Sequence, residues 1–168
     1  DLIIRLRRAR CREMVRIAWR DLSGRADLTE TMDDLSALAD AVLDAALTFL
    51  YRRQCAKMGL PVSPSGVPQE LVVVAMGKLG ARELNFSSDI DLIFAYPESA
   101  AASGTAGTPG SDEWFTRLCR SLVRIIGENT ADGFVFRVDV RLRPDGENGP
   151  LVMNFDNMER YYQEQGRE

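Results

Sequence analysis

The stretch that decides the fold reads Gln69-Glu-Leu-Val-Val-Val-Ala-Met76, then Gly77-Lys-Leu-Gly-Ala-Arg-Glu-Leu-Asn-Phe-Ser-Ser88, then Asp89-Ile-Asp-Leu-Ile-Phe-Ala-Tyr96. The apolar run Leu71–Met76 contains three valines and predicts a buried strand. Gly77 and Gly80 then flank Lys78, a pattern typical of a loop whose backbone lies close to a phosphate. The run from Asp89 to Tyr96 predicts a second strand.

The second strand begins with two carboxylates. Side chains alternate along a strand, so Asp89 and Asp91 are expected on one face, with Cα atoms roughly 6.6–6.8 Å apart. Carboxylates at that spacing can share hard divalent cations such as Mg²⁺, which prefer oxygen ligands. An Asp-x-Asp at the start of a strand is also found at solvated strand ends and in turns, so the spacing alone leaves both interpretations open.

Residues 133–143 form another informative stretch, Gly-Phe-Val-Phe-Arg-Val-Asp-Val-Arg-Leu-Arg. Strict alternation predicts a strand with apolar side chains on one face and charged side chains on the other. The apolar face would comprise Phe136, Val138, Val140 and Leu142, and the charged face Arg137, Asp139, Arg141 and Arg143. A strand whose charged face points to solvent would show the same pattern.

Four helices are expected around these strands, at residues 2–22, 28–58, 111–126 and 155–165, with a brief strand at 151–153. The first helix carries seven arginines. They indicate a solvated, salt-bridged surface or, alternatively, a surface that meets an acidic partner or a neighbouring domain. Residues 97–110 are small and polar, which predicts a disordered loop, and their place after the paired carboxylates is compatible with a lid.

The composition excludes several kinds of protein. The chain has 168 residues, of which 45% are apolar and 27% charged, values typical of a globular domain. Its net charge of −4 gives no general nucleic-acid footprint, and no transmembrane run or signal peptide is recognised. Histidine is absent, which excludes imidazole bases and histidine-ligated zinc. Cys11, Cys55 and Cys119 are scattered and are expected to be reduced thiols of a cytoplasmic protein.

The order of these features resembles the active-site unit of the polymerase-β-like nucleotidyltransferases. That unit has a strand, a glycine-flanked turn, a short helical segment, and a strand that begins Asp-hydrophobic-Asp-hydrophobic. Further matching stretches are NFSSDID at 85–91, DGFVFRVDVRLRP at 132–144 and YYQEQGR at 161–167. With them the chain resembles, over nearly its whole length, the bacterial bifunctional glutamine synthetase adenylyltransferase/adenylyl-removing enzymes, and in particular their amino-terminal, adenylyl-removing half.

The resemblance implies an α+β fold, a mixed sheet flanked by helices with an N-terminal helical segment. Residues 1–60 would be helices that pack on or lead into a catalytic core at 69–168, as part of a longer chain. The resemblance also implies that Asp89, Asp91 and Asp139 are catalytic and hold two Mg²⁺ or Mn²⁺ ions. Six further residues would bind the nucleotide and phosphate groups: Gly77, Lys78, Gly80, Ser88, Arg141 and Arg143.

The implied reaction is phosphorolysis, in which inorganic phosphate attacks an adenylyl-tyrosine of glutamine synthetase and releases ADP and free tyrosine. Such a transferase would be a magnesium-dependent, ATP-binding part of a multifunctional cytoplasmic enzyme that regulates nitrogen metabolism. Its partners would be adenylylated glutamine synthetase, phosphate, an adenine nucleotide, a PII-type signal protein and the adenylyltransferase half of the same chain. Nucleic acid and membranes would have no part.

Two alternatives stay open at this point. ATP-dependent adenylylation of glutamine synthetase would use the same three carboxylates, and Asp145 stands where the removing half more often has an aromatic residue. A regulatory or docking module without turnover is the other alternative, although such a module has no need for the three aspartates. Dinucleotide-binding and P-loop proteins are excluded, because the chain has neither Gly-x-Gly-x-x-Gly nor the P-loop spacing.

Overall fold

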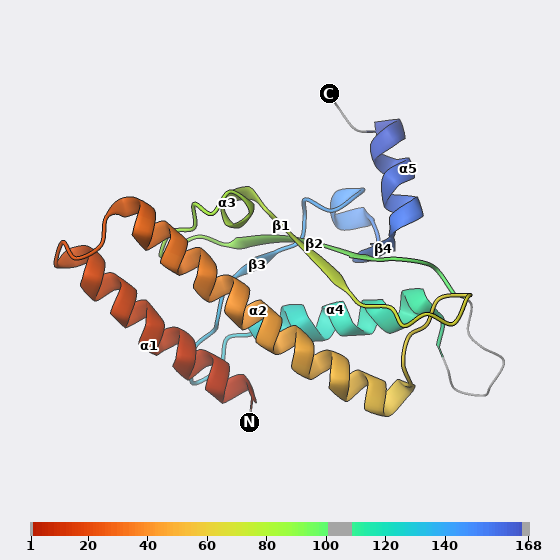
Figure 1. Cartoon of the computed structure of the whole chain (residues 1–168), viewed down its shortest axis with the longest axis horizontal. Coiled ribbons are helices and arrows are strands. Elements are labelled where there is room, and N and C mark those ends of the chain that lie inside the picture. The colour runs from red at the N-terminus through yellow and green to blue at the C-terminus, as the bar shows by residue number, and fades with distance from the viewer. Residues whose placement is uncertain (1, 101–108, 166–168) are drawn as a thin grey trace. The chain divides into compact units, whose positions relative to one another are not determined.

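The computed structural model describes residues 2–100 and 109–165 (Figure 1). Its elements are α1 (Leu2–Leu22), α2 (Leu28–Met58), β1 (Val72–Met76), α3 (Gly77–Gly80), β2 (Ile90–Tyr96), α4 (Ser111–Gly127), β3 (Val138–Asp139), the 3-10 turn η1 (Gly146–Asn148), β4 (Val152–Asn154) and α5 (Phe155–Gln165). This content confirms the predicted α+β class and the four longer helices. Most of the predicted lid or disordered loop, at 101–108, lies outside the described residues.

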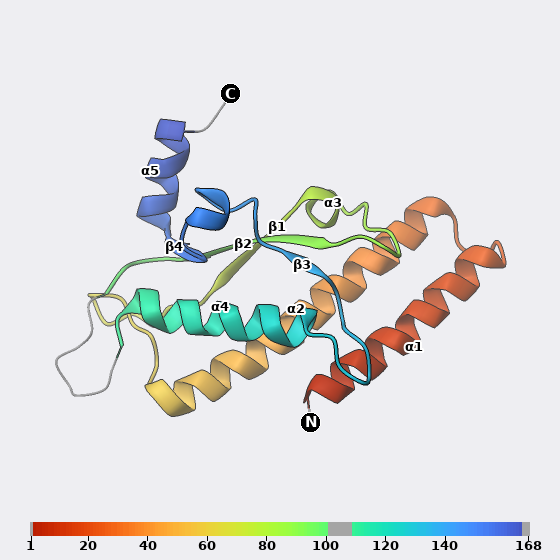
Figure 2. The same ribbon diagram turned by 180° about the vertical axis from the view of Figure 1, so that it is seen from behind.

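Strand β2 is the central strand of a mixed, four-stranded sheet. The sheet order is β1-β2-β3, and β4 also pairs with β2. Both β3 and β4 run parallel to β2, with β3 along its first residues and β4 along Phe94–Tyr96 (Figure 2). Leu92 to Tyr96 are buried, which explains why β2 reads as a continuous apolar run rather than an alternating one.

The chain forms two compact units, each assembled from three segments. The first contains residues 1–48, 75–91 and 122–139, and the second contains residues 49–74, 92–121 and 140–168. The predicted site residues from Gly77 to Asp91, and Asp139, belong to the first unit. Arg141 and Arg143 belong to the second. The predicted division into residues 1–60 and 69–168 stays a prediction.

In the first unit, α1 lies along the beginning of α2 (Figure 1), and ion pairs join the two helices. Arg16 and Arg20 reach Asp34 at 3.2 and 3.3 Å, and Arg20 also pairs with Glu30. The prediction of a salt-bridged basic helix is therefore confirmed for these arginines. Asp27 caps α2, because its Oδ1 accepts a hydrogen bond from the Glu30 amide at 2.8 Å.

Arg7 is an exception among the arginines of α1, because its side chain is buried. Its guanidinium donates to the carbonyl oxygens of Gly133 and Glu128, in the segment that follows α4. A buried guanidinium needs such acceptors, since an unsatisfied buried charge is costly. Arg7 thus fastens the connection between α4 and β3 to α1.

The strand predicted over residues 133–143 is wrong in length, because β3 comprises only Val138 and Asp139. The preceding amides of Val135 and Phe136 both donate to the Ile126 carbonyl at the end of α4, at 3.0 and 3.2 Å. These two amides therefore complete the hydrogen bonding at the end of α4 and do not pair with β2. The alternation also ends early, since Leu142, which was placed on the apolar face, is 52% exposed.

In the second unit, an aromatic cluster forms the core. Tyr96 stacks on Phe115 with ring centroids 4.6 Å apart, and Trp114 packs edge-on against Phe115 and Tyr51 at 5.1 and 5.3 Å. The indole N–H of Trp114 donates to the Gly59 carbonyl at 3.1 Å, so its polar atom is satisfied. The apolar side chains of α4, among them Phe115 and Leu122, are buried.

Tyr51 and Tyr96 should make the fold less stable at strongly alkaline pH. Burial raises the pKa of Tyr51 to about 12, and burial with the hydrogen bond to Asp112 raises the pKa of Tyr96 to about 12. A tyrosine of the unfolded chain has a pKa of about 10. The folded state holds these protons more tightly, so their stabilisation is complete below a pH of about 10 and is lost as the pH approaches about 12. Urea unfolding followed across this range should show the decline, which should be shallower for Tyr96→Phe; constant stability would contradict the prediction.

The three cysteines should differ in reactivity. All are free thiols; Cys11 is exposed, Cys55 is partly exposed and Cys119 is buried. Burial raises the pKa of the Cys55 and Cys119 thiols, and the thiolate is the reactive form. We expect Ellman's reagent to modify Cys11 first and Cys119 only in denaturant, as read from peptide masses. Equal rates for Cys11 and Cys119 in the native chain would contradict this expectation.

The helices of the described ranges include none that is both long and apolar enough to cross a membrane.

Candidate functional site

Asp91 in β2 and Asp139 in β3 are register partners in two parallel strands. Partners at one register position point to the same face of the sheet, and neighbouring strands place their Cα atoms about 4.8 Å apart. Both residues are half-buried. The expectation that Asp139 lies on a strand next to the Asp-x-Asp strand is therefore met, whereas its role as a metal ligand stays a prediction.

Gly77 lies against the carboxylate of Asp91. It follows β1 directly, opens α3 and has a φ of +54°, a conformation that side chains other than glycine rarely adopt. A Cβ atom built on Gly77 would collide with Oδ2 of Asp91. The position therefore requires glycine twice over, once for its backbone conformation and once for the approach of the carboxylate.

Asp89 precedes β2 by one residue, and its side chain is paired with Arg137. The Arg137 Nε donates to Oδ1 of Asp89, and Nη2 donates to the Ser87 carbonyl. The Ile90 amide also donates to the Arg137 carbonyl, at 2.9 Å. The beginning of β2 and the segment before β3 are thus joined through both backbone and side chains.

The loop before Asp89 is organised by Asn85. Its Oδ1 accepts hydrogen bonds from the Ser87 amide at 3.1 Å and from the Ser88 hydroxyl at 2.8 Å. The Ser88 amide in turn donates to the Asn85 carbonyl at 3.2 Å. An asparagine that bonds to groups two and three residues ahead is a common way to fix a tight loop. In this structure the predicted phosphate-binding residue Ser88 contributes to the shape of the loop.

The other residues predicted to bind phosphate have different surroundings. Gly80 lies tightly against β1, since a Cβ there would be 2.5 Å from the Ala75 carbonyl oxygen. Lys78 is exposed within α3.

In the second unit, Arg143 donates to three carbonyls, those of Val140 at 2.7 Å, Glu147 at 3.1 Å and Gly149 at 3.3 Å. Arg143 thus closes the turn around η1, and Arg141 is exposed. A phosphate role for either arginine stays a prediction.

The acidic residues suit a hard divalent cation in chemistry, because carboxylate oxygens are the ligands that Mg²⁺ and Mn²⁺ prefer. Within residues 2–100 and 109–165, however, no three acidic or cysteine side chains lie close enough together to hold one ion. Asp89 is instead paired with the guanidinium of Arg137. The register of β2 and β3 pairs Asp91 with Asp139, Asp89 is held by Arg137, and the predicted metal-binding role of all three stays a prediction.

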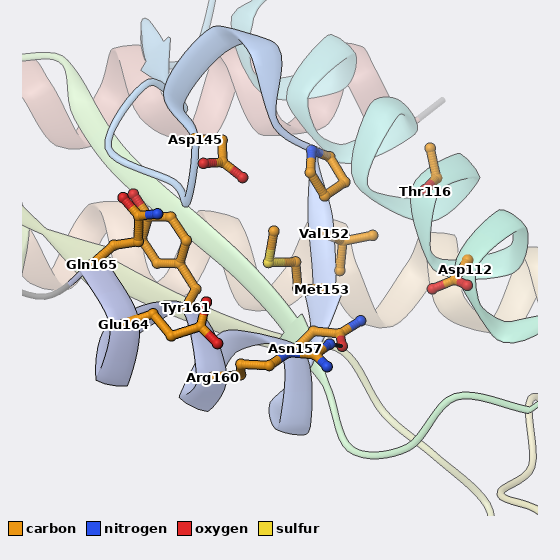
Figure 3. A pocket seen from close by; sticks show the side chains of 11 residues that line it. Asp112, Thr116, Asp145, Val152, Met153, Asn157, Arg160, Tyr161, Glu164 and Gln165 are labelled. Atoms are coloured by element: carbon orange, nitrogen blue, oxygen red, sulfur yellow. Dashed lines mark hydrogen bonds between the residues drawn. The ribbon is translucent and has the colours of Figure 1, made fainter.

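The second unit contains a pocket of about 500 Å³ between α4, β4 and α5 (Figure 3). Asp112 and Thr116 lie on one side of it, opposite Glu164 and Gln165, with Met153 between them. Its other lining residues are Asp145, Pro150, Val152, Asn157, Arg160 and Tyr161. The pocket includes none of the nine residues predicted for the site.

Two residues that shape the site, Arg137 and Asn85, were not among those predicted for it. In the alternating stretch 133–143, Arg137 falls on the same face as Asp139. This shared face was the one feature of the sequence that pointed to a place for Arg137 near the carboxylates. Its pairing with Asp89 depends on a register between segments 48 positions apart, which the sequence does not display. For Asn85 the signal was local, because an asparagine in a polar loop typically bonds the backbone two residues ahead, here that of Ser87.

A mixed α+β sheet with two carboxylates at one register position, beside a glycine-bounded turn, is consistent with the nucleotidyltransferase-like class of proteins. The model of the family described as glutamate-ammonia ligase adenylyltransferase matches residues 1–168. The chain belongs to this family.

Curated relatives include the bifunctional glutamine synthetase adenylyltransferase/adenylyl-removing enzyme of Nitrosococcus oceani, 58% identical over 169 residues and 100% of this chain. The enzyme of the same name from Pseudomonas aeruginosa is 56% identical over 165 residues and 98% of this chain. The chain spans 17% of the length of each of these relatives.

Proposed function

We propose that this chain removes AMP from an adenylylated tyrosine of glutamine synthetase by metal-dependent phosphorolysis. The observation that carries the proposal is the Asp91–Asp139 pair beside Gly77. Phosphoryl transfer needs carboxylates that hold divalent ions and a backbone that comes close to the phosphate. The relatives are named for both an adenylyltransferase and an adenylyl-removing activity. In sequence, the stretches 132–144 and 161–167 of this chain resemble the removing half.

In this proposal Asp91 and Asp139, joined by Asp89, would hold divalent ions, and the charge of these ions would favour both the attacking and the leaving oxygens. Inorganic phosphate is already ionised, so its oxygen attacks the adenylyl phosphorus without a strong general base. This suits a chain that contains no histidine. The bond from phosphorus to the tyrosine oxygen breaks, and the phenolate takes up a proton from water because its pKa is about 10. Lys78 and the backbone around Gly77 bind the phosphoryl oxygens.

The proposal is tested by incubating the chain with adenylylated glutamine synthetase, radiolabelled inorganic phosphate and Mg²⁺. We expect labelled ADP and unmodified synthetase as the products, and no reaction without phosphate. A PII-type signal protein and an adenylyltransferase half are proposed as regulatory partners, so the assay is repeated with each of them. Absence of ADP in all these mixtures, or transfer of AMP from labelled ATP onto unmodified synthetase, contradicts the proposal.

A further inference from the structure

We infer that Arg137 is a built-in competitor of the metal ion, whose guanidinium holds the Asp89 carboxylate until a divalent cation displaces it. The inference rests on the proposed function, because it concerns the same three aspartates. It gives Arg137 the role of a positioning residue that sets how tightly the first ion binds.

The contacts of Arg137 are those of a cation held in place by oxygen atoms. Its Nε donates to Oδ1 of Asp89 and its Nη2 to the carbonyl of Ser87. A carboxylate and a backbone carbonyl are also oxygen donors of the kind that hard divalent ions accept. The guanidinium and a divalent ion are both cations, so the two compete for the same oxygen atoms.

The position of Arg137 makes the competition direct. Ile90 is the register partner of Val138, and its amide donates to the Arg137 carbonyl at 2.9 Å. Asp89 and Arg137 therefore meet two residues before the Asp91–Asp139 pair along both segments. A cation bound to that pair that takes Asp89 as a third carboxylate therefore competes with Arg137 for the same side chain.

The exposure of the ion pair sets the size of the effect. The Arg137 side chain is 61% exposed and the Asp89 side chain 47%, so solvent screens their attraction. If the ion pair must break for the metal to bind, the metal-binding constant falls by a factor of about two to five. A doubly charged ion with several carboxylate ligands overcomes that factor. Arg137 therefore weakens metal binding without preventing it.

The experiment titrates Mn²⁺ into the full chain and follows free Mn²⁺ by electron paramagnetic resonance. Arg137→Gln should bind Mn²⁺ about two- to fivefold more tightly than the unaltered chain. Arg117→Gln is the matched control, because Arg117 also forms an exposed ion pair with a carboxylate, that of Glu113, and its loss changes the net charge equally. The control should leave the Mn²⁺ affinity unchanged. Circular dichroism establishes that each variant is folded.

A second measurement follows Arg137 itself in the unaltered chain. The Nε–H resonance of Arg137, assigned by its loss in Arg137→Lys, should shift when diamagnetic Mg²⁺ is added, because its bond to Asp89 is broken. Unchanged or weaker Mn²⁺ binding by Arg137→Gln, or an unmoved resonance at saturating Mg²⁺, overturns the inference and leaves the proposed function standing. If the unaltered chain binds Mn²⁺ no better than Asp91→Asn does, both the inference and the metal-dependent function are overturned.

Discussion

Replacing Asp91 by asparagine should lower the rate of ADP release from adenylylated glutamine synthetase by about a hundred- to a thousandfold. Asparagine keeps the shape of the side chain against Gly77, so the fold should be preserved. It removes a negative charge from the pair with Asp139, and a neutral amide is a poor ligand for a hard cation. Single-turnover release of ADP at saturating phosphate and Mg²⁺ measures the effect on the reaction itself.

The matched control for this variant is Asp132→Asn. Asp132 is an exposed carboxylate in the turn between α4 and β3, in the same compact unit as Asp91. Its replacement makes the same change of charge and of side-chain chemistry away from the acidic pair. The rate should therefore stay within about twofold of that of the unaltered chain, as expected for an exposed charge. Equal losses in the two variants would exclude Asp91 from the reaction.

Replacing Gly77 by alanine should reduce both stability and activity. The φ of +54° strains any residue with a Cβ, and the added methyl group meets the carboxylate of Asp91. Strain and crowding together should lower the free energy of unfolding by about 2–4 kcal/mol. Asp91 must move to relieve the collision, and a displacement of about 1 Å is expected to slow ADP release about a hundredfold. Urea unfolding and single-turnover kinetics measure the two effects.

Gly24→Ala separates backbone strain from the collision. Gly24 has a similar φ of +66°, but a Cβ there would meet no atom within 4 Å. We expect a loss of about 1–2 kcal/mol in unfolding free energy from the strain alone, with an unchanged rate of ADP release. If Gly77→Ala matched Gly24→Ala in both measurements, the carboxylate of Asp91 would not depend on the glycine.

The long helices could be predicted from the sequence because their signals are local. Helices α1 and α2 begin and end where the apolar period indicates, and in the structure Asp27 caps α2. The central strand β2 was also predictable, since a buried apolar run bounded by polar residues leaves few alternatives. The positions of these elements along the chain depend little on tertiary contacts.

Strand β3 could not be predicted in length, because its boundaries are set by tertiary contacts. Alternation favours a strand from Gly133 to Arg143, yet the Ile126 carbonyl takes the amides of Val135 and Phe136. Beyond Asp139, the guanidinium of Arg143 donates to the carbonyls of Val140, Glu147 and Gly149 and closes a turn. The alternating pattern of residues 133–143 does not show which of its groups make these tertiary hydrogen bonds and which pair with a neighbouring strand.

The candidate site was predictable in part. Alternation and the family resemblance pointed to Asp91 and Asp139, and the register of β2 and β3 brings these two residues together. The surroundings of Asp89 could not be predicted, because its ion pair with Arg137 depends on how two distant segments align. Spacing along one strand predicts which side chains share a face, but it does not predict which cation competes for them.

The brief pairing of β2 with β3 limits where the chain can gain or lose residues. Side chains alternate with a period of two along a strand, so one residue inserted between Arg137 and Asp139 would turn Asp139 to the opposite side of the sheet. The strands could still form, but Asp91 would lose its acidic neighbour. A length change in the turn that follows Asp139 has no such effect on the register. Length variants that keep both carboxylates together are therefore expected after β3 and not immediately before it.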